Sequence, residues 1–378
     1  MLNFVSSTAP IASPARTTAL SSRHAAFVTA APLAVKCGSR STLPALPRPS
    51  SQGNSSPIVA SASPMKKVVI AGGSGVVGRA LVSQLLSLGV PEIVVLTRSP
   101  SSAARVLPSA SEVSVSGWVP GSDDAATAPW AAAVRGADAV VNLCGELIVT
   151  RWSDAKKKEI MDSRVGTTKA LVDAIAALPA AERPKCFVGF SAVGYYPCDD
   201  SKEFDESSPP PTTPNFLTEV TQAWEAAASG LPTGVRSVTI RSGIVLSRGG
   251  GFVAKTEPIF NLFAGGPVGR GTQPVSWVHE RDLARLVATA AADAGYVGVY
   301  NGTAPRPETF KEVCAAMGRA MGRPSLFPVP GPVIKVVFGE GAMVLLEGQR
   351  VMPKRAMEAG FEFEFKDVDS AMKDLFKK

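Results

Sequence analysis

The fold is decided by the stretch Lys66-Lys67-Val68-Val69-Ile70-Ala71-Gly72-Gly73-Ser74-Gly75-Val76-Val77-Gly78-Arg79-Ala80-Leu81. An apolar run leads into three glycines spaced three apart, and an apolar helical period begins directly after them. This pattern predicts a strand, a tight turn and a helix N-terminus, which together bind a pyrophosphate. Glycine suits the turn because a backbone without Cβ atoms bends tightly and approaches phosphates closely. We therefore predict nucleotide binding by Gly72, Gly75, Val76, Val77 and Gly78.

Short apolar runs alternate with helical patterns along the following chain. Strands are predicted at 92–97, 112–116, 137–143, 186–191 and 237–241, and helices at about 76–88, 125–135, 153–177 and 215–229. This alternation predicts an α/β fold with a doubly wound parallel (Rossmann) sheet, whose ligand binds at the carboxyl ends of the strands. We expect the Rossmann domain to span 65–245. A smaller substrate lobe and C-terminal segment should span 246–378, with chain partly shared between the two domains.

The first 64 residues differ in composition from the rest. They contain no Asp or Glu, carry five basic residues, and are rich in Ser, Thr, Ala and Pro. This composition predicts a disordered plastid transit peptide, and hence a chloroplast protein of the stroma. A disordered tail without a targeting role is the alternative. Cleavage after Cys37 and cleavage near 59–62 are both left open, as is association with the inner envelope.

Charge and residue usage exclude several classes of protein. Of the 39 basic residues, five lie in the leader, which leaves 34 against 32 acidic residues and no case for nucleic-acid binding. No apolar run is long enough to span a bilayer. Five cysteines without metal or disulfide spacing, and only two histidines, predict no metal site. Homodimer formation is left open.

The end of the second predicted strand indicates which cofactor binds. NAD sites usually offer an acidic side chain there to the ribose 2′-hydroxyl, whereas this chain has Thr97-Arg98-Ser99. A guanidinium suits a 2′-phosphate, so Thr97 and Arg98 predict NADP(H). Arg98 as a solvated surface residue is the alternative. Asn142, Cys144 and Gly145 follow the fourth strand and are predicted to form a wall of the cofactor site, or else a plain turn.

These residues together resemble the extended short-chain dehydrogenase/reductase superfamily. The matching segments are Gly72–Gly78, Asn142–Gly145, Arg164–Thr168, Ser191–Tyr196, Gln222–Glu225, Gly266–Gly271, Val278–Leu283 and Leu346–Pro353. Together they look like its atypical "epimerase family" branch, whose plant plastid members are called SulA-like or giant-chloroplast proteins. The resemblance covers about 66–375, and it implies that 278–283 opens a helix of the substrate lobe.

The superfamily moves a proton with a Tyr-x-x-x-Lys pair, and this chain departs from that pattern. The resemblance puts the pair within 215–221, where neither a tyrosine nor a lysine occurs. Ser191, Tyr195 and Tyr196 follow the fifth strand and are the candidate catalytic groups, with aromatic packing as the alternative for the tyrosines. We expect Glu225 and Arg241 to form an internal ion pair.

Four further features carry weaker expectations. His279 with Asp282 is an alternative acid–base pair, and Arg270 is an alternative anion anchor. Asp205 and Glu206 are expected to be solvated. The apolar stripe over 333–338 is expected to pack inside the lobe, with contact to a partner or membrane as the alternative.

The sequence thus favours an NADP(H)-dependent oxidoreductase or epimerase-like enzyme of the plastid, acting on an unknown small substrate. The alternative is a catalytically weak NADP(H)-binding regulatory protein, which the resemblance connects with plastid division at the envelope. A nucleotide-binding scaffold whose C-terminal segment contacts a partner or membrane is a third interpretation.

Overall fold

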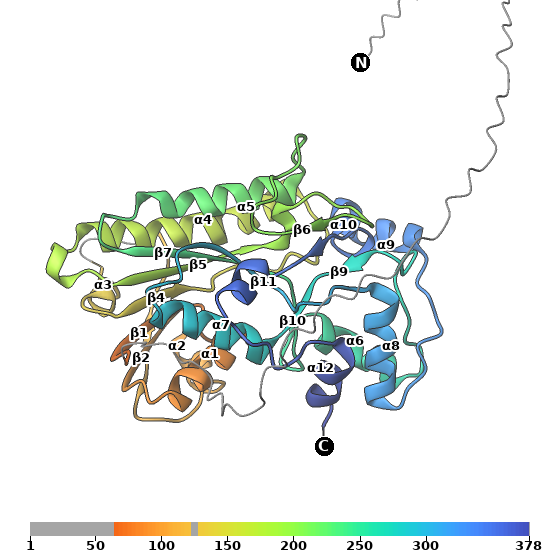
Figure 1. Ribbon diagram of the computed structural model, residues 1–378, viewed down its shortest axis with the longest axis horizontal. Coiled ribbons are helices and arrows are strands. Elements are labelled where there is room, and N and C mark those ends of the chain that lie inside the picture. Colours follow the sequence, from red (N-terminus) through yellow and green to blue (C-terminus); the bar gives the residue numbers. More distant parts are fainter. Residues whose placement is uncertain (1–63, 122–127, 378) are drawn as a thin grey trace, which may run out of the picture. The chain divides into compact units, whose positions relative to one another are not determined.

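A seven-stranded parallel sheet forms the centre of the computed structural model, which describes residues 64–121 and 128–377 (Figure 1). Its order is β11-β7-β5-β4-β1-β2-β3. The strands are β1 (Lys67–Ala71), β2 (Glu92–Thr97), β3 (Val113–Gly117), β4 (Ala139–Asn142), β5 (Cys186–Ala192), β7 (Arg236–Ser242) and β11 (Gly298–Gly302). The chain reverses its direction of winding between β1 and β4, so the predicted doubly wound Rossmann sheet is confirmed. Residues 1–63 of the predicted leader lie outside the described residues.

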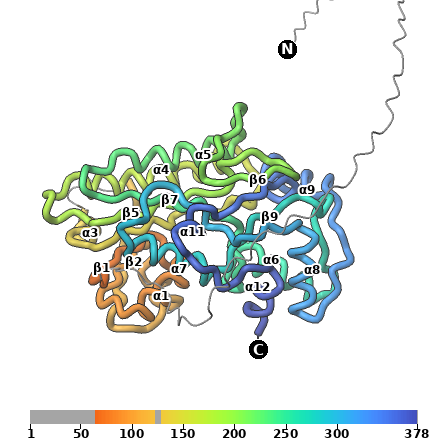
Figure 2. The backbone as a smooth tube through the Cα atoms, in the orientation of Figure 1, coloured from red at the N-terminus to blue at the C-terminus, as the bar shows by residue number. Residues whose placement is uncertain are grey.

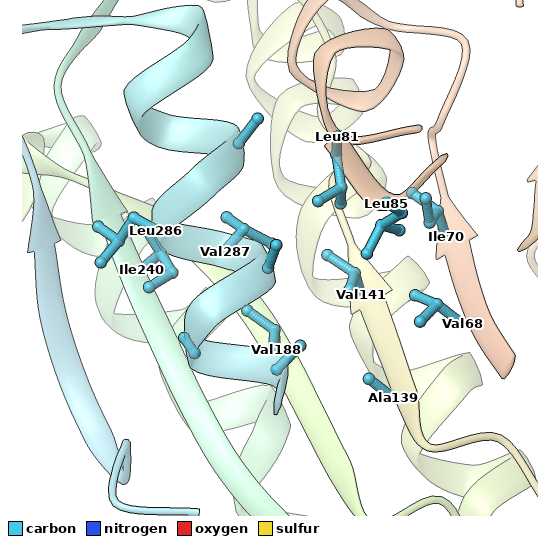
Figure 3. Close-up of a cluster of buried hydrophobic side chains, with 14 of the residues drawn as sticks. Val68, Ile70, Leu81, Leu85, Ala139, Val141, Val188, Ile240, Leu286 and Val287 are labelled. Carbon is cyan, nitrogen blue, oxygen red and sulfur yellow. The ribbon is translucent and has the colours of Figure 1, made fainter. Parts of the chain in front are cut away.

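Helices cover both faces of this sheet (Figures 1 and 2). One face carries α1 (Val76–Ser87) and α7 (Glu280–Ala292), and the other carries α3 (Ala131–Val134), α4 (Asp154–Ala177) and α5 (Phe216–Ala226). Residues of α1 and α7 meet strand residues in one buried cluster, where Leu81 and Leu85 lie near Val287 (Figure 3). The expectation that 278–283 opens a helix of the substrate lobe is therefore wrong, because α7 packs on the central sheet.

Local sequence signals explain where several of these helices begin. Ser153 caps α4 by accepting a hydrogen bond from the Lys156 amide, and Asn215 caps α5 in the same way. The predicted helix at 125–135 is reduced to the short α3, and 122–127 lie outside the described residues. A short helix, α2 (Pro100–Ala104), precedes β3.

The edge strand β11 was not predicted from the sequence. This strand comes from the second half of the chain, yet it pairs with β7 over five residues. Only two of its residues, Val299 and Tyr300, are apolar, and glycines stand at both ends. Its strand conformation therefore depends on pairing with β7 rather than on a local pattern.

A second lobe is built from helices and short strands around its own core. Its helices are α6 (Gly251–Asn261), α8 (Phe310–Met321) and α12 (Val368–Leu375), and its short strands are β8 (Ile244–Leu246), β9 (Pro274–Val275), β10 (Trp277–His279) and β12 (Glu308–Thr309). Trp277 and Met317 are fully buried in this core. A capping box at Thr309 starts α8, and Gly322 at φ +64° ends it.

The C-terminal segment returns to the Rossmann domain before it reaches α12. It contains α9 (Gly331–Phe338), α10 (Met343–Leu346), β13 (Arg350–Val351) and α11 (Lys354–Glu358). Strand β13 pairs with β6 (Glu203–Phe204), and the Arg151 side chain donates to the Val336 carbonyl oxygen at 2.8 Å. These contacts hold the segment against the chain that follows β4 and β5.

Helix α9 does not pack as expected. Ile334 is its one buried residue, whereas Val333, Val336 and Val337 are 49%, 75% and 54% exposed. Packing inside the lobe therefore does not account for this apolar stripe. Within the described residues, no helix combines the length and apolar character needed to cross a membrane.

Candidate functional site

The glycine turn between β1 and α1 has the predicted geometry. Gly72 has φ +77°, and its carbonyl oxygen accepts from the Gly75 amide at 3.1 Å. A Cβ atom on Gly78 would lie 2.4 Å from the Gly73 Cα, so the helix can approach the turn only with glycine at this position. A Cβ on Gly72 would lie 3.1 Å from the Cys144 amide nitrogen. The turn is thus pressed against the end of β4.

An open cavity of about 270 Å³ lies over this turn. Its lining residues are Gly72, Gly75, Val76, Val77, Gly78, Leu143, Gly145, Val245, Gly250 and Gly251. This lining includes all five residues predicted in the glycine turn, together with Gly145. A backbone-lined hollow at the N-terminus of α1 fits the pyrophosphate of a dinucleotide, because amides there can meet phosphate oxygens without interference from side chains. Leu143, Val245, Gly250 and Gly251 were not anticipated as lining residues.

Asn142 stabilises the chain next to this cavity. It is fully buried, its amide nitrogen donates to Thr168 Oγ1 at 2.9 Å, and its Oδ1 accepts from the Cys144 amide at 3.1 Å. Burial raises the pKa of the Cys144 thiol to about 12, so this thiol stays protonated near neutral pH. Asn142 and Cys144 therefore fix the path of the chain, whereas Gly145 lines the cavity.

Arg98 lies at the end of β2, beyond the half-buried Thr97, and its side chain is exposed. Its positive charge opposes the burial-driven rise in the Cys144 pKa and contributes to the lowered pKa of Glu146, which places Arg98 near the end of β4. An exposed cation at this end of the sheet suits a 2′-phosphate. Direct contact of Thr97 and Arg98 with a cofactor stays a prediction.

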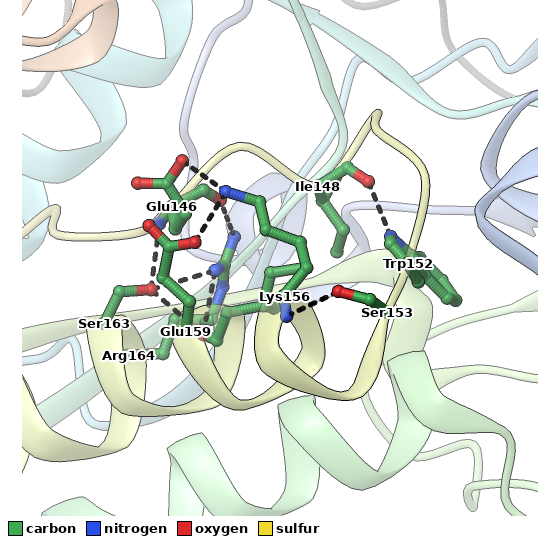
Figure 4. A network of polar contacts seen from close by, with 9 residues as sticks. Glu146, Ile148, Trp152, Ser153, Lys156, Glu159, Ser163 and Arg164 are labelled. Atoms are coloured by element: carbon green, nitrogen blue, oxygen red, sulfur yellow. Dashed lines mark hydrogen bonds and ion pairs between the residues drawn. The ribbon is translucent and has the colours of Figure 1, made fainter. Parts of the chain in front are cut away.

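A polar network stiffens the chain between β4 and α4 (Figure 4). Lys156 Nζ lies 2.9 Å from both Glu146 and Glu159, and the hydrogen bond from Lys156 lowers the pKa of Glu146. Arg164 donates to the Glu146 carbonyl oxygen at 3.0 Å, and burial lowers the Arg164 pKa to about 10. Because the Arg164 guanidinium also lies against Gly145, this network holds one wall of the cavity in place.

A second cluster gathers at the carboxyl ends of β5 and β7. Ser191 and Arg241 are paired residues in the register of the two strands. The Arg241 guanidinium makes two hydrogen bonds to the Glu225 carboxylate, at 2.7 and 2.8 Å, which confirms the expected ion pair. Ser191 is 2% exposed, and its hydroxyl has no hydrogen-bond partner among the described residues. A buried hydroxyl without a partner is available to a ligand.

The two adjacent tyrosines have different environments. Tyr196 is buried, donates to Asn301 Oδ1 at 2.8 Å and accepts from Arg241 at 2.9 Å, and burial raises its pKa to about 12. Tyr195 is partly exposed, and its ring centroid lies 3.3 Å from the Arg241 Cζ. The Tyr196 hydroxyl is therefore occupied by buried hydrogen bonds, whereas Tyr195 is partly exposed and lies beside a cation.

Helix α5 carries no substitute for the missing proton relay. Asn215 serves as its cap, Phe216 packs edge-on against Trp152 at 5.0 Å, and Leu217 lies against Gly194. The segment that would carry the tyrosine and lysine is used for packing instead.

The weaker sequence candidates mostly have structural roles. His279 caps α7, stacks on Phe365 and lies nearer to Asp374 than to Asp282, and burial lowers its pKa to about 4. Asp282 accepts from the backbone amides of Glu364 and Phe365. The two side chains thus hold C-terminal chain and form no acid–base pair with each other.

Arg270 and the acidic residues Asp205 and Glu206 also carry expectations from the sequence. Arg270 is exposed and forms an ion pair with Asp200 at 2.8 Å. Asp205 remains partly exposed and pairs with the exposed Lys354, whereas the expectation that Glu206 is solvated is wrong. Glu206 accepts from the backbone amides of Asn301 and Arg355, and burial raises its pKa.

Comparison with known proteins supports the nucleotide-binding assignment of the fold. Residues 68–301 match the NAD dependent epimerase/dehydratase family, and 329–375 match a domain of unknown function, DUF1731. The "Epimerase family protein SDR39U1 homolog, chloroplastic" of Arabidopsis thaliana is 43% identical over 310 residues, which are 82% of this chain and 86% of the relative. The Bos taurus "Epimerase family protein SDR39U1" is 38% identical, over 82% of this chain and 99% of the relative.

A solved structure shows the same fold. The human epimerase family protein SDR39U1 (isoform 2) with NADPH is 36% identical, with a TM-score of 0.72 over 82% of this chain and 99% of the human chain. The human protein thus holds the cofactor that the Thr97-Arg98-Ser99 segment predicts for this chain. The glycine turn, the order of the sheet and these matches together mean that the chain belongs to the NAD-dependent epimerase/dehydratase family.

Proposed function

We propose that this protein is an NADP(H)-dependent oxidoreductase or epimerase-like enzyme of the plastid that acts on a small substrate. One observation carries the enzymatic part. Tyr195, a partly exposed phenol, lies on the buried Arg241 guanidinium at the sheet edge that also holds the cavity. Arg98 and the NADPH of the human relative support the phosphorylated cofactor.

The described residues suit two of the phosphate groups of such a cofactor. The amides of Val76 and Val77, in the first turn of α1, would hold the pyrophosphate, and Arg98 would bind the 2′-phosphate. When bound, NADP(H) supplies or accepts a hydride at the substrate carbon. The protein must then supply a proton at the neighbouring oxygen during reduction, or accept one from it during oxidation.

Tyr195 is the proposed source of that proton. During reduction, its O–H bond breaks while a bond from the proton to the substrate oxygen forms, and the reverse reaction returns the proton. The Arg241 guanidinium stacks on the ring and holds it in place, and Glu225 fixes the orientation of Arg241. Ser191 would donate a hydrogen bond to the same substrate oxygen.

A binding measurement and a rate measurement together test this proposal. NADPH at about 100 times its Kd should stabilise the purified protein by about 2.7 kcal/mol, and NADH should stabilise it less. A screen of aldehydes, ketones and nucleotide sugars should then identify a substrate for NADPH oxidation. Tyr195→Phe should lower kcat by about 100-fold with an unchanged Kd for NADPH. An unchanged kcat would overturn the role of Tyr195.

The plastid location rests on the composition of the leader and on the chloroplastic name of the Arabidopsis relative. Fusion of residues 1–64 to a fluorescent protein should direct import into isolated chloroplasts. Import of the fusion after Arg16, Arg23 and Lys36 are all changed to Glu would argue against a transit peptide.

A catalytically weak NADP(H)-binding regulator, acting in plastid division at the envelope, is the second candidate. The packing role of Phe216 and Leu217 in α5 favours it, and so does the exposed apolar face of α9. Such a protein should bind NADPH without turnover. It should also pellet with galactolipid and phosphatidylglycerol vesicles, and Val336→Asp should weaken pelleting. Turnover of any screened substrate at an enzymatic rate would remove this candidate.

A further inference from the structure

We propose that a second glycine turn, Gly249–Gly251, forms the opposite wall of the dinucleotide cavity and contacts the cofactor's pyrophosphate. The proposal rests on the proposed cofactor and is independent of catalytic turnover. The turn comes from the second lobe, where it connects β8 to α6. It lies more than 160 residues after the glycine turn of β1 and α1 in the sequence.

Close packing places this second turn against α1. A Cβ on Gly250 would lie 2.5 Å from Val76 Cγ2, and one on Gly249 would lie 2.5 Å from Arg79 Nη2. Gly250 and Gly251 line the same cavity as Val76 and Val77. The two glycine turns therefore face one space, and a side chain on Gly250 would displace the turn from α1.

Side chains on both sides hold the second turn in position. Arg79, on the first turn of α1, donates to the Gly249 carbonyl oxygen at 3.0 Å. The Gly249 amide donates to Ser247 Oγ at 2.9 Å. Ser247 is fully buried and lies beside Glu280, at the start of α7. The helix that begins the cofactor site thus also fixes its second wall.

The chemistry of the cavity indicates what the second turn contacts. Its lining consists of glycine, valine and leucine residues, so recognition of an anionic group depends on backbone amides. Within 64–121 and 128–377, no protein acceptor receives the amides of Gly250 and Gly251. The turn lies beside Val76, in the first turn of α1, where a pyrophosphate binds in this type of site. A diphosphate bound between the two glycine turns would accept hydrogen bonds from the backbone amides of both turns.

Fragments of the cofactor separate this contact from recognition of the 2′-phosphate. Phospho-ADP-ribose, with its phosphate on the adenosine 2′-oxygen, contains the pyrophosphate, and adenosine 2′-monophosphate lacks it. Gly250→Val should weaken NADPH and phospho-ADP-ribose by about tenfold or more, through lost charge-assisted hydrogen bonds. Binding of adenosine 2′-monophosphate should not change. Gly166→Val is the matched control, because a Cβ at that position meets nothing within 4 Å.

A second variant covers the case in which Gly250→Val does not fold. Arg79→Met keeps most of the side-chain length but loses the hydrogen bond to Gly249, so it should weaken phospho-ADP-ribose about threefold and leave adenosine 2′-monophosphate unchanged. Unchanged phospho-ADP-ribose binding in every folded variant would overturn the proposal. Failure of the unsubstituted protein to bind NADPH would instead overturn the proposed cofactor, which is a separate result.

Discussion

The two ends of the candidate site are built differently. At the nucleotide end, which is the glycine turn between β1 and α1, the backbone determines the geometry. Gly72 has a positive φ, and there is no room for a Cβ atom at Gly78. At the proposed catalytic end, side chains determine the geometry, through the contacts of Arg241 with Glu225 and Tyr195. A backbone site is visible as a spacing of glycines, whereas a side-chain site depends on which strands become neighbours.

Because of this difference, substitutions at the two ends should have different effects. A change at the nucleotide end should mainly affect ligand binding, since the cavity is lined by small residues. Loss of the Glu225 or Arg241 side chain at the other end should mainly affect stability, since the Arg241 cation is almost completely buried.

The largest expected effect is at the catalytic end. Glu225→Ala leaves the Arg241 guanidinium buried without its carboxylate, which should lower the free energy of unfolding by about 3–5 kcal/mol. Urea unfolding measures this loss. Asp173→Ala is the control, because its ion pair with Lys169 is exposed and should change stability by less than about 1 kcal/mol. Equal effects of the two variants would mean that the Arg241 cluster is not a buried unit.

The nucleotide end should respond next in size. Gly78→Ala forces α1 away from Gly73, so it should cost about 1–3 kcal/mol of stability and remove the stabilisation by NADPH. Thermal unfolding with and without NADPH measures both quantities. Gly166→Ala adds a methyl group in open space on α4 and should keep the response to NADPH. A Gly78→Ala protein that still responds to NADPH would contradict the backbone description of this end.

Sequence patterns predicted much of the fold because local signals specify it. The apolar run 92–97 matches β2 residue for residue, and α4 begins one residue after its predicted start, at a Ser153 cap. Strand β11 escaped prediction because its pairing with β7 is long-range. Helix α7 was assigned to the wrong layer because its apolar face does not reveal which sheet it covers.

The candidate site shows the same limit. The glycine turn could be predicted because its neighbours in sequence are also its neighbours in space. The Gly249–Gly251 turn carries no signal that marks it as part of the site, and its contact with Val76 relates it to the cavity. Likewise, no local pattern distinguishes Tyr195 from Tyr196, since Arg241 and Asn301 come from other strands.

A third prediction sharpens the distinction between these tyrosines. Tyr196→Phe removes the buried hydrogen bond to Asn301 Oδ1 and the one from the Arg241 guanidinium, so it should cost about 1–3 kcal/mol of stability. Tyr195→Phe should cost less than about 0.5 kcal/mol, because its side chain is partly exposed. Urea unfolding of both variants provides the comparison. A larger loss for Tyr195→Phe would mean that Tyr195 is the structural member of the pair.

The smallest expected effect concerns cofactor choice at the rim of the nucleotide end. Arg98→Ala should weaken NADPH by about tenfold through loss of one charge-assisted contact, while binding of NADH should hardly change. Titration with the two cofactors measures this ratio, and Arg105→Ala is the control because Arg105 is a nearby exposed arginine that bonds to Ser102. Equal weakening of NADPH and NADH would show that Arg98 acts through general electrostatic attraction. In that case Arg98 would strengthen the binding of both cofactors without discriminating between them.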